Sequence, residues 1–443
     1  MAVNYLGEKI NSVEILEQLV YKLDCYFYVG EQDAEKKELS CGTNLIEQAF
    51  LWDLVCSYKL NRPYINIYTG AAGDMLLRRT IKLYESVTFG NAFFNDREVY
   101  VTAGAGEALD ITFGYLHSIN KQNVLVIGAQ YPIVGRTISQ NGMYFQEMIG
   151  ESDNNFMPEI AAVEKAIYEG GFDCIFLTQP NNPSGGMYSK EELRRLVKAA
   201  QEYHMVIIYE KVGSDFLMDE NAGGIDCFND MASDELIVID SLSKRRALSG
   251  LKIGYVISDK SKFARTLEQM KFGSCAPCVG NKGVIVDLYF SFLLYHEMHN
   301  KQYEKTELCY EIENEIEKLG CLQHMFQQFK EEIAHMQKSI LENQLILSQK
   351  CQKFIVGQTH RDGGFNYLVN FKLREGLSDY KLARRIYRKC GVRVYPLACF
   401  LIDQNLNQKF WEEGNCWIRV SLAVETEEMV KCCDLISQYY ECM

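Results

Sequence analysis

The sequence predicts an α/β fold: a large domain with a mostly parallel β-sheet flanked by helices, and a smaller α+β C-terminal domain. Two observations support it. Residues 100–260 alternate short apolar runs with amphipathic helical runs, the pattern of a parallel sheet covered by helices. About the last hundred residues mix strand and helix patterns. Ligands of such sheets bind beyond the carboxyl ends of the strands, so polar residues that follow a strand are site candidates.

Five short runs in the first region are expected to be strands, because they are apolar at most positions and rich in Val and Ile. Strands that are covered on both faces have this composition. They span residues 123–127, 174–178, 205–209, 236–240 and 254–258. The clearest helix covers residues 189–204, where Ser189 and Glu192 form a capping box and apolar residues recur at helical spacing.

The region after the predicted sheet is different in character. Residues 281–355 are charged, helical in period and free of proline, so we expect a long helix or a pair of helices leading into a second domain. Beyond them we expect strands at 367–371 and 416–421 and helices at 380–390 and 425–439. The expected domains are a large one of residues 61–290 and a smaller one formed by residues 1–60 and 291–443.

The composition is that of an acidic globular protein: the 443 residues carry a net charge of −13, and the pI is about 5.2. This charge argues against nucleic acid or an anionic membrane as the main partner. The first thirty residues lack a signal-peptide pattern and no apolar run is long enough to span a bilayer, so we expect a cytoplasmic protein with free thiols. The pairs Cys275/Cys278 and Cys432/Cys433 have no second pair at metal-site spacing. We therefore interpret both as buried or incidental thiols and expect no metal site.

One lysine stands at the end of an expected strand. Ser241-Leu-Ser-Lys244 directly follows residues 236–240, and Ser249-Gly-Leu-Lys-Ile-Gly254 comes shortly after it. A lysine in this place, flanked by small hydroxyl residues, suits a Schiff base beside a phosphate group. The alternative is a surface lysine in a basic stretch, because Arg245 and Arg246 come next.

Two further loops also follow expected strands or open expected helices. Thr102-Ala-Gly-Ala-Gly-Glu-Ala-Leu109 opens a helix with small residues, whose free backbone amides can bind phosphate. The alternative is a dinucleotide-binding loop, but the third glycine of that pattern is missing. Gln179-Pro-Asn-Asn-Pro-Ser-Gly185 follows the expected strand 174–178, and two prolines fix a loop in which Asn182 offers a neutral donor. An ordinary turn is the alternative there.

Together these segments offer what pyridoxal phosphate (PLP) needs from a protein: a Schiff-base lysine, a carboxylate for the pyridine nitrogen, phosphate donors, a flat side chain over the ring and a cation for the substrate. From about Tyr64 to Arg419 the sequence resembles the class I and II aminotransferase family, of PLP fold type I. The Asn-Pro-Ser-Gly string, followed about sixty residues later by Ser-x-Ser-Lys, is the most specific part. The resemblance implies that PLP is the cofactor and that residues 61–290 are the PLP-binding domain.

The resemblance also implies roles for single residues. Lys244 would be the Schiff-base lysine and proton shuttle, Glu210 the acid that faces the pyridine nitrogen, and Tyr131 the ring that stacks on the cofactor. Asn182 would bind the ring hydroxyl oxygen, and Arg419 would grip the substrate carboxylate, with Asn182 as a second substrate-binding residue. The implied phosphate ligands are the amides of Ala105 and Gly106, the hydroxyls of Ser241 and Ser243, Lys252, and Tyr68 reaching from a partner subunit.

Three positions depart from the family pattern. Glu210 stands where the family usually has aspartate, Gly213 where it has tyrosine, and Lys252 where it has an arginine that binds phosphate. Glutamate reaches one methylene further, glycine removes a phenol that would hydrogen-bond the ring oxygen, and lysine lacks the planar fork of arginine. Tyr209 precedes Glu210, but its side chain is expected on the other face of the strand.

The sequence therefore predicts a PLP enzyme that acts on an α-amino acid, with transamination to a 2-oxo acid as the leading reaction. Because of the three departures, β- or γ-elimination or cyclisation is the second interpretation. An alternative of another class is a non-catalytic partner subunit with the same fold. The resemblance implies a homodimer, and the substrate side chain is expected to meet residues 42–44 and 273–280, which do not identify it.

Overall fold

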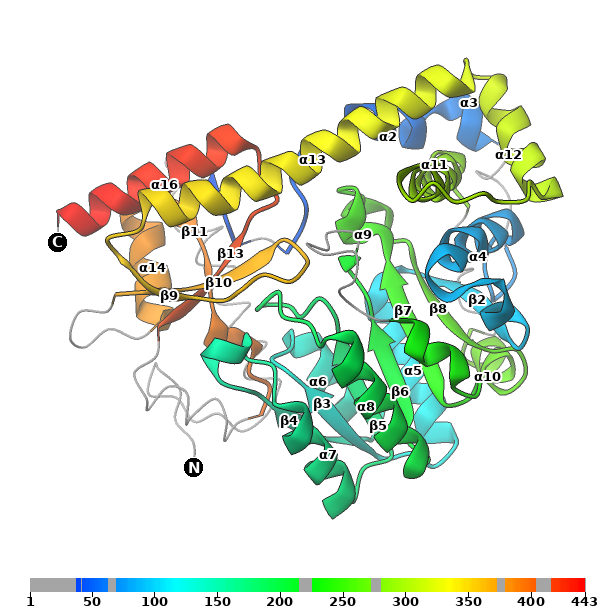
Figure 1. The fold of residues 1–443 in the computed structure, drawn as a ribbon, viewed down its shortest axis with the longest axis horizontal. Helices are drawn as coiled ribbons and strands as arrows, with labels where there is room; N and C mark the ends of the chain where they lie inside the picture. Colours follow the sequence, from blue (N-terminus) through cyan, green and yellow to red (C-terminus); the bar gives the residue numbers. More distant parts are fainter. Residues whose placement is uncertain are drawn as a thin grey trace. The chain divides into compact units, whose positions relative to one another are not determined.

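The computed structural model describes residues 37–40, 42–62, 69–214, 225–271, 280–372, 379–403 and 416–442. By their internal contacts these residues form two units. Figure 1 labels their helices and strands. Unit 1 comprises the described parts of residues 1–46, 116–224 and 338–443, and unit 2 comprises those of residues 47–115 and 225–337.

Unit 1 contains four parallel strands in the order β6-β5-β3-β4. They are β3 (Asn123–Ile127), β4 (Tyr144–Met148), β5 (Cys174–Thr178) and β6 (Val206–Glu210). The helices between them are α6 (Pro132–Gln140), α7 (Ile160–Glu169) and α8 (Lys190–Glu202), of which α7 and α8 pack against each other. All of β5 and nearly all of β3 and β6 are buried, which explains why these strands are continuous apolar runs in the sequence.

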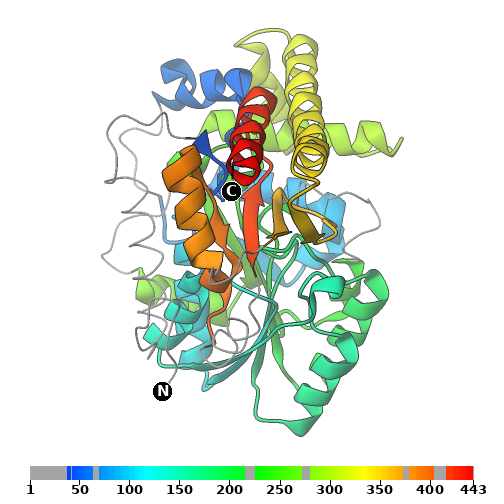
Figure 2. The same ribbon diagram turned by 90° about the vertical axis from the view of Figure 1, so that its left-hand side faces the viewer.

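The C-terminal part of unit 1 is a separate antiparallel sheet in the order β12-β13-β10-β9. Its strands are β9 (Ile355–Gln358), β10 (Asn366–Phe371), β12 (Tyr395–Pro396) and β13 (Trp417–Ser421). Helix α14 (Asp379–Cys390) packs against β13 and against α16 (Thr426–Glu441), which lies beside it (Figure 2). A short parallel pair joins β1 (Lys37–Glu38) to β11 (Val392–Arg393).

Unit 2 contains three antiparallel strands in the order β2-β8-β7. They are β2 (Arg97–Thr102), β7 (Leu236–Ser241) and β8 (Gly254–Asp259). Its helices are α2 (Ala49–Cys56), α3 (Tyr58–Asn61), α4 (Met75–Phe89), the short α9 (Leu242–Arg245), α10 (Lys262–Met270), α11 (Lys282–Met298) and α12 (Glu307–Glu317). Helix α11, buried over its first half, packs against α2, α4 and α12. Two helices, α5 (Gly104–Ser118) and α13 (Leu322–Lys350), begin in unit 2 and end in unit 1.

The structure confirms the predicted fold class and the five strands of the first region, with ends that shift by at most one residue. It also confirms the capping box, in which Ser189 and Glu192 bond each other's backbone at the start of α8. Strand β2 was not among the predicted elements. Among the described residues, no helix is both long and apolar enough to cross a bilayer.

The prediction of one or two helices over residues 281–355 was wrong, because α11, α12 and α13 occupy this stretch. The first break follows His299, where Asn300 adopts a left-handed backbone conformation with φ of 49°. Asparagine tolerates that conformation better than most residues. The second break lies near Gly320, between α12 and α13. Neither break contains a proline, which was the signal used to exclude breaks.

A buried acid caps the first turn of α14. Asp379 is 1% exposed. Its Oδ1 accepts a 2.7 Å hydrogen bond from its neighbour Tyr380 N, and Oδ2 accepts a 3.4 Å bond from Ala398 N. Burial outweighs these bonds and raises the pKa of Asp379 from 3.8 to about 7.

We predict that this carboxyl group makes the protein less stable as the pH rises. Its folded-state pKa lies above that of the unfolded chain, so folding favours the protonated form, and stability is lost between pH about 4 and about 7. Asp379→Asn keeps an oxygen acceptor and has no proton to lose, so its free energy of unfolding should depend less on pH across that window. Urea unfolding of both proteins at several pH values measures the two slopes. Equal slopes would show that Asp379 does not titrate in this window.

Candidate functional site

In unit 2, the segment with the predicted Schiff-base lysine continues directly from β7 into α9. Ser241 caps α9: its Oγ accepts a 3.2 Å hydrogen bond from Ser243 N and donates to Ser243 Oγ at 2.9 Å. Lys244 lies in the single turn of α9 and is partly exposed. The two serine hydroxyls thus contact each other at the carboxyl end of β7, and Lys244 follows directly in the sequence.

The predicted phosphate loop lies at the start of α5, also in unit 2. Gly104 has a φ of +81°, and Ala105 and Gly106 follow in the first turn, where backbone amides have no partner within the helix. Gly254 begins β8 so close to this turn that a Cβ there would lie 2.9 Å from Ala105 N. Lys252 is exposed, and its Cδ would lie 3.9 Å from a Cβ built on Gly104. These amides and this cation form a donor set that fits a phosphate group.

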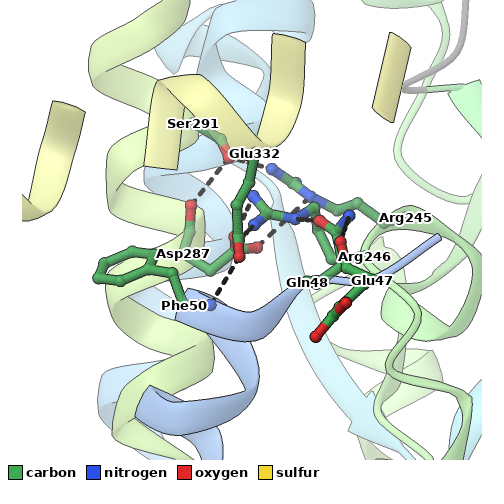
Figure 3. Close-up of polar contacts among 8 residues, drawn as sticks. All are labelled: Glu47, Gln48, Phe50, Arg245, Arg246, Asp287, Ser291 and Glu332. Atoms are coloured by element: carbon green, nitrogen blue, oxygen red, sulfur yellow. Dashed lines mark hydrogen bonds and ion pairs between the residues drawn. The ribbon is translucent and has the colours of Figure 1, made fainter. Parts of the chain in front are cut away.

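The two arginines after Lys244 are not a surface basic stretch. Arg245 is 4% exposed and Arg246 is fully buried. Figure 3 shows the guanidinium of Arg246 held by Gln48 Oε1, by Asp287 Oδ1 at 3.1 Å and by Glu332 Oε2. Burial lowers the pKa of Arg246 and raises the pKa of Glu332, so desolvation is a substantial cost of this cluster.

The cluster also ties separate elements of unit 2 together. Glu332 from α13 accepts a 2.6 Å bond from Phe50 N at the start of α2 (Figure 3). Asp287 from α11 lies 3.6 Å from Arg245 Nε as well. The chain immediately after Lys244 is therefore anchored to three helices.

In unit 1, Glu210 is the last residue of β6 and is partly exposed. It pairs in register with Thr178, the last residue of β5, and Thr178 Oγ1 lies 2.9 Å from Glu210 Oε2. Tyr209 is fully buried and, as the neighbouring strand residue, faces the other side of the sheet. Gly213 has a φ of +92°, a conformation that would strain a residue with a side chain.

Asn182 and Arg419 are also brought together in unit 1. Arg419 lies in β13 and is 3% exposed. Its Nη1 donates a 2.9 Å hydrogen bond to Asn182 Oδ1, and its Nη2 donates to Ser40 O. Because Oδ1 of Asn182 faces the arginine, its Nδ2 amide points away and keeps its donor character. The guanidinium lies over Phe400, with its central carbon 4.6 Å from the ring centroid.

Tyr131 occupies the position just before the first residue of α6 and is 43% exposed. Its ring lies 6.2 Å from that of Phe400, so one aromatic side chain contacts both Tyr131 and Arg419. The predicted residue Tyr68 and the pair Cys275/Cys278 lie outside the described residues, as do residues 273–279 of the expected substrate pocket. Cys432 and Cys433 are fully buried free thiols, as interpreted from the sequence.

Near Glu210, the sequence reasoning missed two residues that contact this acid directly or through one hydroxyl. Thr178 hydrogen-bonds Glu210, and Gln130 Oε1 lies 3.0 Å from Thr178 Oγ1. Both are buried. Their positions gave a signal: Thr178 ends a strand just before Gln179-Pro-Asn-Asn, and Gln130 stands directly before Tyr131.

Residues 60–286 match the model of the family described as "Aminotransferase class I and II". The alanine aminotransferase of Mycobacterium tuberculosis is 26% identical over 195 residues, which are 44% of each chain. The matched regions span 64%, 60% and 44% of the length of three curated relatives, so they leave a large part of each uncompared.

Solved structures extend the likeness to nearly the whole chain. The aspartate aminotransferase of Thermotoga maritima superposes with a TM-score of 0.68 at 17% identity and covers 98% of both chains. The alanine aminotransferase of Pyrococcus furiosus gives a TM-score of 0.71 at 16% identity, covering 98% of this chain and all of its own. At these identities the likeness shows a shared fold.

We predict that breaking the Arg246 cluster is strongly destabilising. Arg246→Met removes the cation of the part-buried Glu332 carboxylate and leaves the buried Asp287 with only the more distant Arg245, a loss of about 3–5 kcal/mol in the free energy of unfolding. The matched control is Arg195→Met, which removes a partly exposed pair with Glu164 and should cause no comparable loss. Urea unfolding of the three proteins measures the difference. Equal losses of unfolding free energy in the two variants would contradict a stabilising role for the Arg246 cluster.

Proposed function

Because the chain belongs to the class I and II aminotransferase family, we propose that it is a PLP-dependent aminotransferase that converts an α-amino acid into a 2-oxo acid. The observation that carries this proposal is the family match over residues 60–286, which contains Lys244, Asn182 and Glu210. PLP dependence is a property of the family. The donor set at the start of α5 and around α9 supports the same cofactor, because it combines hydroxyls, backbone amides and a lysine.

The bound cofactor would supply an electron-withdrawing ring that stabilises negative charge at the substrate α-carbon. Lys244 would hold it as a Schiff base. The amine of Lys244 would also act as the base that moves the proton of the substrate α-carbon.

The remaining predicted ligands would each act at one part of the cofactor. Glu210 would keep the pyridine nitrogen protonated, and Tyr131 would cover the ring. Asn182 would donate through Nδ2 to the ring hydroxyl oxygen, which its orientation toward Arg419 favours. The phosphate would be bound by Ala105, Gly106, Ser241, Ser243 and Lys252, with Tyr68 contributed by a second subunit.

Arg419 would bind the substrate carboxylate. Its guanidinium is buried and is already oriented by Asn182 Oδ1, by Ser40 O and by the Phe400 ring. A cation held in this way loses little side-chain entropy when a carboxylate binds. The planar fork can then form the paired bonds that favour a carboxylate over other anions.

Three further points complete the proposal. The protein would act as a homodimer in which Tyr68 serves the neighbouring subunit. It would reside in the cytoplasm, and the twelve cysteines among the described residues, all free thiols, suit a reducing compartment. The division into residues 61–290 and residues 1–60 with 291–443 stays a prediction.

The proposed reaction predicts stoichiometric transfer of an amino group. We expect PLP-loaded protein, incubated with a panel of amino acids and 2-oxoglutarate, to form one 2-oxo acid and one glutamate per turnover with at least one amino acid. Mass spectrometry identifies the products. Release of ammonia or a cyclised product without glutamate would replace transamination by elimination or cyclisation. Absence of any product across the panel would favour a non-catalytic subunit.

A second prediction concerns the substrate carboxylate. Arg419→Lys keeps the charge but loses the fork, so we expect kcat/KM for the best amino acid to fall about a hundredfold or more. The variant should still bind PLP, as measured by absorbance. The matched control is Arg361→Lys, also 3% exposed but bonded to Gln344 and to Gly364 O, which should keep kcat/KM near the wild-type value. Equal losses in the two variants would contradict the role of Arg419.

A further inference from the structure

A buried hydroxyl lies beside the acid proposed to face the pyridine nitrogen. Thr178 is 3% exposed, and its Oγ1 lies 2.9 Å from Glu210 Oε2. The two residues are opposite each other in the parallel ladder of β5 and β6, so their side chains leave the sheet on the same face. This contact is made entirely within unit 1.

The same hydroxyl has a second acceptor. Gln130 Oε1 lies 3.0 Å from Thr178 Oγ1, and Gln130 Nε2 donates a 3.0 Å bond to Ile127 O. Turning the amide over would point Oε1 at that carbonyl oxygen, so the donor required by Ile127 O fixes the orientation of Gln130. The backbone of Gln130 is held too, because its N–H donates to Phe400 O at 2.8 Å.

A threonine hydroxyl carries one proton and cannot donate to both acceptors at once. When Glu210 is ionised, the proton goes to its carboxylate, because a bond to a charged acceptor is about twice as strong as one to a neutral amide. When Glu210 holds a proton, it can donate to Thr178, which then donates to Gln130 Oε1. Turning one hydroxyl therefore satisfies Glu210 in either charge state.

We propose that Thr178 is a positioning residue of the reaction: it holds the Glu210 carboxylate in place for the pyridine nitrogen and stabilises its charge. This inference rests on the proposed function. Glutamate has one more rotatable bond than aspartate, so its carboxylate needs an additional contact to stay in one place. The strand-end threonine supplies that contact, and Gln130 limits which way its hydroxyl can turn.

The test compares PLP with an analogue whose ring nitrogen is replaced by C–H, which cannot interact with Glu210 in the same way. The dissociation constants of both for the apoprotein are measured by absorbance titration, without reliance on turnover. In the wild type we expect PLP to bind more tightly than the analogue. In Thr178→Val, which removes the hydroxyl and keeps the shape, this preference should shrink about ten- to hundredfold, the loss expected for a hydrogen bond to a charged group.

Two variants serve as references. Thr178→Ser restores the hydroxyl and should recover the wild-type preference. Thr80→Val removes a fully buried hydroxyl that bonds only its own helix at Leu76 O in the described structure, and should leave the preference unchanged. If Thr178→Val does not fold, as judged by circular dichroism, Thr178→Ala is measured instead with the same expectation.

The outcomes separate this inference from the proposed function. A Thr178→Val or Thr178→Ala protein that folds and keeps the full preference for PLP overturns the positioning role alone. A wild-type protein that binds PLP and its analogue equally well shows that Glu210 does not act on the ring nitrogen, and also overturns the inference. A wild-type protein that binds neither compound contradicts the proposed function itself.

Discussion

The in-register parallel pairing of β3, β5 and β6 is the constraint on which the predicted site residues of unit 1 depend. Parallel strands that end at one edge present their last side chains to the same region. Thr178 and Glu210 meet because they occupy paired positions at that edge. Gln130 and Tyr131 follow β3, the next strand in the order, and Asn182 follows β5. A slip of one residue would turn Thr178 and Glu210 to opposite faces.

Unit 2 uses a different constraint for Lys244. Its segment is short, since α9 comprises only Leu242–Arg245, and an isolated helical turn has little stability of its own. The guanidinium of Arg246 secures it through Gln48, Asp287 and Glu332. Such a cluster costs desolvation and adds little net stability. It nevertheless makes displacement of this backbone segment costly. That suits Lys244, whose amine is proposed to bond to one atom of the cofactor.

The sequence predicted what short-range patterns determine. Strands β3 and β5 matched their expected bounds because both faces are covered and the apolar run ends where the strand ends. The break at Asn300 was missed because a left-handed backbone at a non-glycine residue leaves a weak trace in sequence. The break near Gly320 was missed because only proline was taken as a signal for a break. The pairing of Asn182 with Arg419, 237 positions away in sequence, follows from tertiary structure. The burial of Arg246 could not be predicted for the same reason, because its partners Asp287 and Glu332 lie in helices distant in sequence.

The departures from the family pattern acquire physical meaning in this structure. Gly213 has a backbone conformation in which a tyrosine would be strained. Glu210 has the hydroxyl of Thr178 at hydrogen-bonding distance. Both features bear on function only if Lys244 carries the cofactor, as we propose. The most direct test is borohydride reduction of PLP-loaded protein followed by peptide mapping. The account predicts one pyridoxyl group per chain, on Lys244, and none in Lys244→Ala. A label on another lysine, or no label on wild-type protein, would contradict it.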